Sequence, residues 1–336
     1  MNAARTILGM LAICFAVIAS AVATAAPPIV VRFNLDAAED SPRGRAAEKF
    51  KQLAEAATHG GVRVELFTNG TLYGARDELE ALQLGAVQMA CPSLNSFSAL
   101  GLSDFDAFEL PFLFDSYDAV RRVTDGPVGA SMLATLRQKG IEGLGFWDLG
   151  FKQITANRPV RLPEDLRGLT IRTTYSRVSE MELRALGAVP KPMGFADTRE
   201  ALSRGELDGT ELTTHLIDKL RLDEVQRYVT LSNHAYLGSA LVVNRRFWEK
   251  LPADVRAALA GAAREATIFA NEATKKADND AVAALRARGR IQVLELTDLE
   301  LRRWKQVLML VHRQSNDRIS PETLGAIYHA AGFSPE

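Results

Sequence analysis

Strand-like and helix-like segments alternate along the chain after residue 28, and this alternation restricts the fold more than any other feature. Residues 29–35 (IVVRFNL) and 62–68 (VRVELFT) are rich in β-branched residues, and the segment Pro42–Ala57 between them has the spacing of an amphipathic helix. A helical segment at 75–85 and an apolar strand at 87–93 follow. This order predicts an α/β protein with a largely parallel sheet.

A second series of the same kind begins near residue 142. It contains expected strands at 142–157, 169–174, 188–195 and 207–212, with helices at 177–186 and 197–204. The full length of 336 residues fits two domains at about 150 residues each. We therefore predict two lobes: the first from 27–149 plus about 238–278, and the second from 150–237 plus about 279–336.

A polar, alanine-rich run near the C-terminus contains neither glycine nor proline between Ala262 and Arg288. A single helix from Asp254 to Arg288 would be about 50 Å long and could bridge both lobes. Two shorter helices with a break near Asn279 are the alternative.

The first residues have the pattern of a secretory signal peptide. Arg5 precedes an apolar segment, Ile7–Val22, and Ala23-Thr24-Ala25 is a small-x-small cleavage site. Cleavage after residue 25 would release the mature protein into the periplasm. An uncleaved anchor is the alternative, but the apolar segment is shorter than the roughly 20 residues that span a bilayer.

Charge and motifs exclude several classes of function. The net charge of −1 gives no basic surface for nucleic acid. The sequence has no G-x-S-x-G, no G-x-x-x-x-G-K-[ST] and no C-x-x-C, and its five histidines lack zinc-site spacing. Asp104, Asp106 and Glu109 lack the glycine and closing glutamate of a calcium loop, which favours a solvated loop. We expect no metal and no cofactor.

Arg172 is the charged residue whose role the sequence leaves most open. In the strand-like stretch GLTIRTT, Leu169 and Ile171 point to one face, and Thr170 and Arg172 point to the other. A structural ion pair is the usual role of a charged strand residue. The alternative partner for Arg172 is an anionic group of a bound ligand.

Several stretches resemble, in the same order, the extracytoplasmic solute-binding proteins of TRAP transporters, the sodium-driven bacterial carriers of organic acids. They are NGTLYGARDELEALQLGAVQMACPSL, FELPFLFDSYDAVRRVTDGPVG, GFWDLGFKQITANRPVRLPEDLRGLTIRT, LDGTEL and EVQRYVTLSNHAYLGSALVVNRRFWEKLP. The resemblance extends from about Val31 to Arg256 and is greatest to the branch that binds C4-dicarboxylates. It implies two α/β lobes, crossing hinge strands, a long lobe-spanning helix and closure on a carboxylate ligand.

The resemblance also implies roles for individual residues. Arg172 matches the arginine that binds the ligand carboxylate, and Lys152 in GFKQITAN would supply a second cation. Ser93 in CPSL would face the cleft, with a turn hydroxyl as the alternative. Phe195 in PMGF would pack against the ligand, with a core ring as the alternative.

One position departs from the family pattern. The motif after Asp208-Gly209 usually contains an asparagine that hydrogen-bonds the ligand, whereas this chain has Leu212 there. Either Thr213 or Thr214 takes over that contact, or the ligand is more apolar at this point.

The resemblance implies a non-enzymatic, monomeric binding protein. It would capture an organic acid, such as malate, fumarate or succinate, and deliver it to TRAP membrane subunits. Another carboxylate (a uronate, 2-oxo acid or aromatic acid) and a sensor for a membrane receptor are alternatives. A secreted enzyme with Lys152 or His215 as base is a third.

Overall fold

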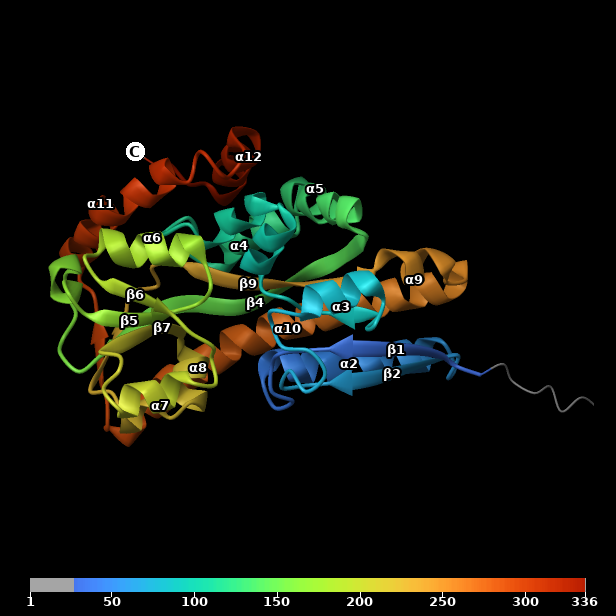
Figure 1. Cartoon of the computed structure of the whole chain (residues 1–336), viewed down its shortest axis with the longest axis horizontal. Coiled ribbons are helices and arrows are strands. Elements are labelled where there is room, and N and C mark those ends of the chain that lie inside the picture. Colours follow the sequence, from blue (N-terminus) through green and yellow to red (C-terminus); the bar gives the residue numbers. More distant parts are fainter. Residues whose placement is uncertain (1–26, 336) are drawn as a thin grey trace, which may run out of the picture.

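The computed structural model describes residues 27–335, which form an elongated α/β molecule (Figure 1). The expected signal peptide, residues 1–25, lies outside the described residues. In the described part of the chain, no helix combines the length and the apolar character that a membrane span requires.

The first unit of the fold consists of β1, α2, β2, α3 and β3, in the order that the sequence predicts. Strand β1 pairs in parallel with both β2 and β3. Helix α2 begins where Ser41 accepts a hydrogen bond from the N–H of Gly44 and Pro42 fills the first helical position. The bounds are β1 Ile29–Asn34, α2 Pro42–Ala57, β2 Val62–Phe67, α3 Glu78–Leu84 and β3 Met89–Ala90.

The second unit is built around β5, which pairs in parallel with β6 and β7, and around the parallel pair β8 and β10. Helices α6, α7 and α8 connect or cover these strands (Figure 1). The bounds are β5 Thr170–Thr173, α6 Arg177–Ala185, β6 Val189–Pro192, α7 Thr198–Ser203, β7 Gly209–Thr213, α8 Thr214–Lys219, β8 Tyr228–Leu231 and β10 Gln292–Glu295.

Two long antiparallel strands, β4 (Ile141–Ala156) and β9 (Tyr236–Asn244), join the two units. Strand β9 pairs with β3 of the first unit, and the last part of β4, from Lys152 to Ala156, pairs with β7 of the second unit. The strand order β2-β1-β3-β9-β4-β7-β5-β6 is therefore mixed. The expectation of a largely parallel sheet is wrong at its centre, whereas the crossing strands are present.

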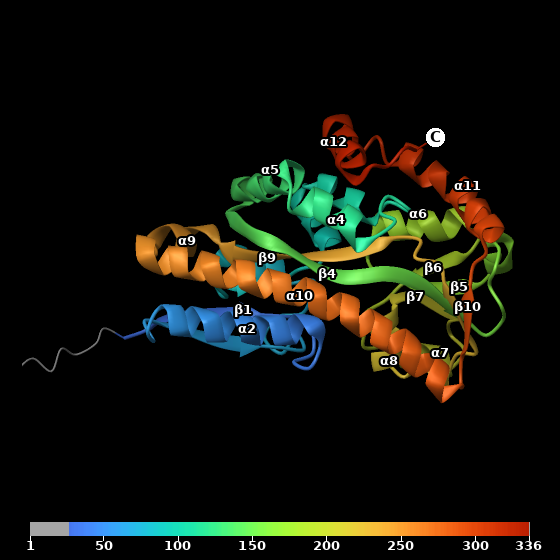
Figure 2. The same ribbon diagram turned by 180° about the vertical axis from the view of Figure 1, so that it is seen from behind.

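Helix α10 (Ala253–Arg288) is a single unbroken helix of 36 residues. At 1.5 Å per residue it is about 54 Å long. It packs against α2 of the first unit and α8 of the second, and Figure 2 shows it running diagonally past both. The single-helix prediction is confirmed, and a break near Asn279 is wrong.

The last two helices, α11 and α12, pack against helices from earlier parts of the chain. Helix α11 packs on α6, but α12 packs on α4 and α5, which belong to residues 27–149. The expected assignment of residues 279–336 to the second lobe therefore does not follow the packing of α12.

The bounds of the remaining helices are α4 Tyr117–Thr124, α5 Pro127–Thr135, α9 Arg245–Lys250, α11 Asp298–Gln314 and α12 Pro321–Ala331. The short 3-10 helices are η1 Leu94–Leu100, η2 Ser103–Glu109, η3 Leu136–Lys139, η4 Pro163–Leu166 and η5 Leu222–Glu224.

Buried apolar side chains form three clusters. One lies between β1, β2, α2 and α10 and includes Phe33 and Phe50. Another lies in the second unit and includes Ile217 and Val229. The largest joins the η1 and η2 region to the second unit and the C-terminal helices. A continuous core therefore connects the two units.

Candidate functional site

A cavity of about 1420 Å³ lies between the two units. The first unit contributes the residues that follow β1 and β3 and those that precede α3. The second contributes the loops after β5 and β6 and helix α8, and β4 and α10 also line it. Because the carboxyl ends of parallel strands are the usual ligand edge of an α/β sheet, this cavity is the candidate site.

Arg172 is buried at this cavity without a carboxylate partner in the described chain. Arg172 is 3% exposed. Its Nε and Nη2 donate to the carbonyl oxygen of Met193 at 3.1 and 2.8 Å. Nη1 has no hydrogen-bond partner among residues 27–335. Burial lowers the pKa of Arg172 to about 10, so the guanidinium stays charged at neutral pH.

Three further residues expected in the site line the same cavity. Ser93 follows β3 and forms an isolated β-bridge with Ser239 of β9. Phe195 follows β6 and is 37% exposed, whereas Leu212 is buried within β7. Phe195 is therefore not a core ring. Contact of these side chains with a ligand stays a prediction.

Lys152 and Thr213 are not among the residues that line the cavity. The ammonium of Lys152 lies 2.5 Å from Glu182 Oε2 and 3.4 Å from Glu211 Oε2, and it donates to Ser179 Oγ at 2.9 Å. The hydroxyl of Thr213 lies 3.3 Å from Nδ1 of His215. In this structure the charge of Lys152 is already matched by protein carboxylates.

The groups around Lys152 form a fully buried network that titrates as a unit. Burial raises the pKa of Glu182 to about 8, against the attraction of Lys152. Burial acts in the same direction on Glu211, but Lys152 and the hydrogen bond from His234 outweigh it and lower its pKa. Burial lowers the pKa of His234. The network therefore holds one buried cation among acidic groups.

Glu182, Glu211 and His234 also have the composition of a metal site, with one potential ligand atom from each within 4.8 Å of the others. The ammonium of Lys152 lies at this point and supplies the positive charge. A metal ion would have to displace it, so the residues do not fit a metal centre.

The expectation of a solvated loop at Asp106 and Glu109 is wrong, because both are buried at the cavity edge. Asp106 accepts a hydrogen bond from Ser98 at 2.5 Å and pairs with Arg318 at 3.3 Å. Glu109 accepts from Ser176, the residue before α6, and from Ser179 of α6. Local charge pattern did not reveal these long-range partners.

Two aspartates that sequence reasoning did not assign connect the elements around the cavity. Asp148 of β4 accepts from Arg121 and from the hydroxyl of Tyr236, and burial raises its pKa to about 6. Asp278 of α10 accepts from Tyr117 at 2.9 Å and from Thr214 at 2.8 Å. No sequence signal identifies either residue, because their partners are far away in the chain.

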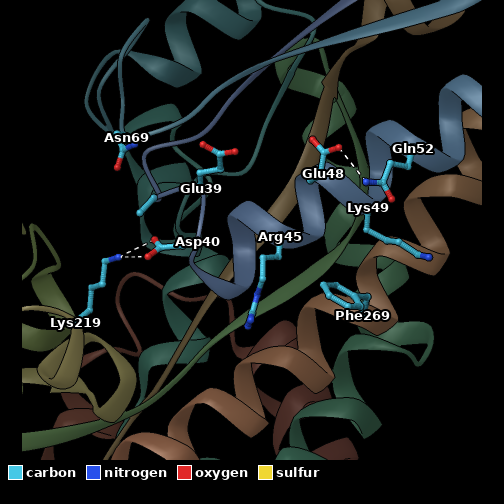
Figure 3. A pocket seen from close by; sticks show the side chains of 10 residues that line it. Glu39, Asp40, Arg45, Glu48, Lys49, Gln52, Asn69, Lys219 and Phe269 are labelled. Atoms are coloured by element: carbon cyan, nitrogen blue, oxygen red, sulfur yellow. Dashed lines mark hydrogen bonds and ion pairs between the residues drawn. The ribbon is translucent and has the colours of Figure 1, made fainter.

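A second, more open hollow of about 780 Å³ adjoins the cavity (Figure 3). Its lining mixes acidic residues such as Glu48 with basic residues such as Lys49, which lie on α2. Lys219, at the end of α8, pairs with Asp40 of the loop before α2 at 2.5 Å, as the dashed lines in Figure 3 show. This exposed ion pair connects the two units across the mouth of the cleft.

Comparison with known proteins places the chain in a family. Residues 33–318 match the model of the DctP family, described as bacterial extracellular solute-binding protein, family 7. The C4-dicarboxylate-binding periplasmic protein DctP of Rhodobacter capsulatus is 45% identical over 96% of this chain and 97% of its own length.

Solved structures agree with this match. A TRAP periplasmic solute-binding protein from Shewanella oneidensis with bound succinate is 34% identical, with a TM-score of 0.86 over 90% of this chain and 99% of its own. The sugar acid binding protein of Advenella mimigardefordensis in complex with galactonate is 29% identical, with a TM-score of 0.86 over 91% of this chain and 98% of its own. The resemblance and the fold class inferred from the sequence are confirmed. The chain is a TRAP solute-binding protein and belongs to the bacterial extracellular solute-binding proteins of family 7, the DctP family.

Proposed function

We propose that this protein binds a C4-dicarboxylate, such as succinate, malate or fumarate, in the cavity between its units, with Arg172 as the carboxylate-binding residue. It then delivers the ligand to the membrane subunits of a TRAP transporter. The observation that carries this proposal is the unpartnered Nη1 of Arg172. A buried cation without an anion is unfavourable, and a ligand carboxylate would supply that anion.

The orientation of the guanidinium supports a particular contact. Its Nε–Nη2 edge is occupied by the carbonyl of Met193, so Nη1 and the second N–H of Nη2 are the donors that a ligand would satisfy. These two nitrogens match the spacing of the two oxygens of a carboxylate. The ligand would therefore approach Arg172 end-on.

The lining near Arg172 favours a ligand with few hydroxyl groups. Leu212, which stands where the family pattern has asparagine, presents an apolar side chain to the cavity. A sugar acid would leave hydroxyl groups facing Leu212 without hydrogen bonds, which disfavours its binding. The methylene carbons of succinate need no such partner.

The size of the cavity supports closure on binding. Its volume of about 1420 Å³ exceeds the roughly 300–1,000 Å³ of usual small-molecule pockets, so a four-carbon acid would not fill it. Rotation of the units about β4, β9 and α10 would enclose the ligand. The closed form is the one that a membrane partner would recognise.

The 45% identical relative is named for C4-dicarboxylate binding, and a 34% identical structure contains succinate. Both are described as periplasmic, and we propose the same location and a monomeric, non-enzymatic protein here. A role in sensing would use the same site. Loss of organic-acid uptake when the gene is deleted would separate transport from sensing.

Titration calorimetry with the mature protein tests the ligand class. Succinate, malate and fumarate should bind more tightly than galactonate, galacturonate and 2-oxoglutarate, and should raise the melting temperature most. Tighter binding of a sugar acid would contradict the proposed class while retaining a solute-binding role. Turnover of any of these acids would instead support the enzyme alternative.

A further inference from the structure

A ligand with two carboxylates leaves one anion beyond the reach of Arg172, and Lys152 is matched by Glu182 and Glu211. Most other cations at the cavity also have partners. The ion pairs are Arg43–Asp36, Lys219–Asp40, Lys276–Asp280 and Arg318–Asp106. Within residues 27–335, the lining arginines and lysines that have no carboxylate at ion-pair distance are Arg45, Arg76, Arg172 and Arg177.

Among these candidates, Arg76 is held next to the loop that carries Arg172. Its guanidinium carbon lies 4.3 Å from the ring centroid of Tyr175. Tyr175 follows Arg172 by three residues, and its phenol is close enough to act on the pKa of Arg172. Because Arg76 precedes α3 of the first unit and Tyr175 precedes α6 of the second, this contact crosses the cleft.

The contact with Tyr175 leaves Arg76 able to bind an anion. A cation–π contact over the Tyr175 ring does not neutralise the charge of the guanidinium, whose N–H donors lie in its plane and point away from its centre. In the described chain no acceptor is assigned to these donors, and both residues line the cavity. Tyr175 would thus fix the position of Arg76 without neutralising it.

We propose that Arg76 binds the second carboxylate of the ligand and that Tyr175 positions it. This assignment rests on the proposed function and replaces the one that the sequence suggested for Lys152. Arg172 of the second unit and Arg76 of the first would then each hold one end of the dicarboxylate. The selectivity for two carboxylates over one would depend on both units meeting, which couples selectivity to closure.

Calorimetric titration of the mature protein with succinate and with its monomethyl ester tests the assignment. The ester keeps one carboxylate and nearly the same shape. In the wild type, succinate should bind at least about tenfold more tightly than the ester, since a charge-assisted contact is lost. In Arg76→Gln, succinate affinity should fall by about tenfold or more, the ester should change little, and the preference should nearly disappear.

Arg177→Gln is the matched control, because Arg177 is an exposed, unpaired arginine at the same cavity without the contact to Tyr175. It should keep the preference for succinate. An equal loss for both ligands in Arg76→Gln would overturn the assignment, because Arg76 would then stabilise closure alone. Unchanged binding of both would overturn it as well. A wild type that fails to bind succinate would instead overturn the proposed function, and this assignment with it.

Discussion

Arg172 donates hydrogen bonds from both Nε and Nη2 to one acceptor, the carbonyl oxygen of Met193, at 3.1 and 2.8 Å. Met193 directly follows β6, the strand next to β5, so the contact fixes the guanidinium relative to the sheet. The remaining end of the guanidinium is held in a constant direction before any ligand arrives. Such preorganisation reduces the entropy that binding must remove.

Lys152→Met should reduce the stability of the protein. It would leave the Glu211 carboxylate, whose pKa Lys152 helps to lower, buried without its cation, which costs about 3 kcal/mol or more of unfolding free energy. Urea unfolding gives this free energy. Lys276→Met is the control, because Lys276 is exposed on α10 and pairs only with Asp280, so stability should change by less than about 0.5 kcal/mol. Normal stability with weakened succinate binding would contradict the buried ion-pair role and favour direct ligand contact by Lys152.

Glu182→Gln should change how stability depends on pH. The pKa of Glu182 is raised from about 4.5 to about 8 by burial, so the folded state binds this proton more firmly than the unfolded state. Its contribution to stability is therefore complete below about pH 4.5 and is lost as pH rises to about 8.

The melting temperature of the wild type should accordingly fall more steeply between about pH 5 and 8 than that of Glu182→Gln. His234 acts in the opposite direction, because its lowered pKa favours the folded state as pH rises, and it remains in both proteins. The difference between the two curves therefore reports the titration of Glu182 together with its effect on the neighbouring Glu211. Parallel curves would show that this carboxyl does not retain its proton in the folded protein.

Gly150→Ala should be strongly destabilising. Gly150 of β4 has φ +111°, and a Cβ there would overlap with Oδ2 of Asp278. We expect a loss of more than about 3 kcal/mol from strain and from displacement of Asp278. Gly168→Ala is the matched control, because Gly168 has φ +75° but no atom lies within 4 Å of the added Cβ. This variant should lose about 1 kcal/mol of unfolding free energy. Similar losses in both variants, measured by urea unfolding, would mean that Asp278 can move away freely.

The helices and strands could be predicted where the pattern is local. Ser41 and Pro42 mark the start of α2, and the absence of glycine and proline after Ala262 indicated the long α10. The antiparallel pairing of β4 with β9 could not be predicted, because alternating apolar residues look the same in either strand direction.

The site could be predicted only in part, for a similar reason. The role of Arg172 came from resemblance, since its strand pattern also fits an ion pair. The burial of Lys152 depends on Glu182 and Glu211, which are 30 and 59 positions away and which no local pattern connects to it. The contact of Arg76 with Tyr175 forms only when the two units face each other.

Calorimetric titration of Arg172→Ala and Arg172→Lys with succinate, beside their melting temperatures, tests the central claim most directly. Arg172→Ala should weaken binding by about 3 kcal/mol or more, roughly a hundredfold or more, because the ligand carboxylate loses its partner. Arg172→Lys should also bind poorly, because an ammonium cannot form the two-pronged contact. Both melting temperatures should change little, since in the described chain Arg172 has no carboxylate partner to lose. Unchanged affinity together with a large fall in melting temperature would contradict the account and show that Arg172 is structural.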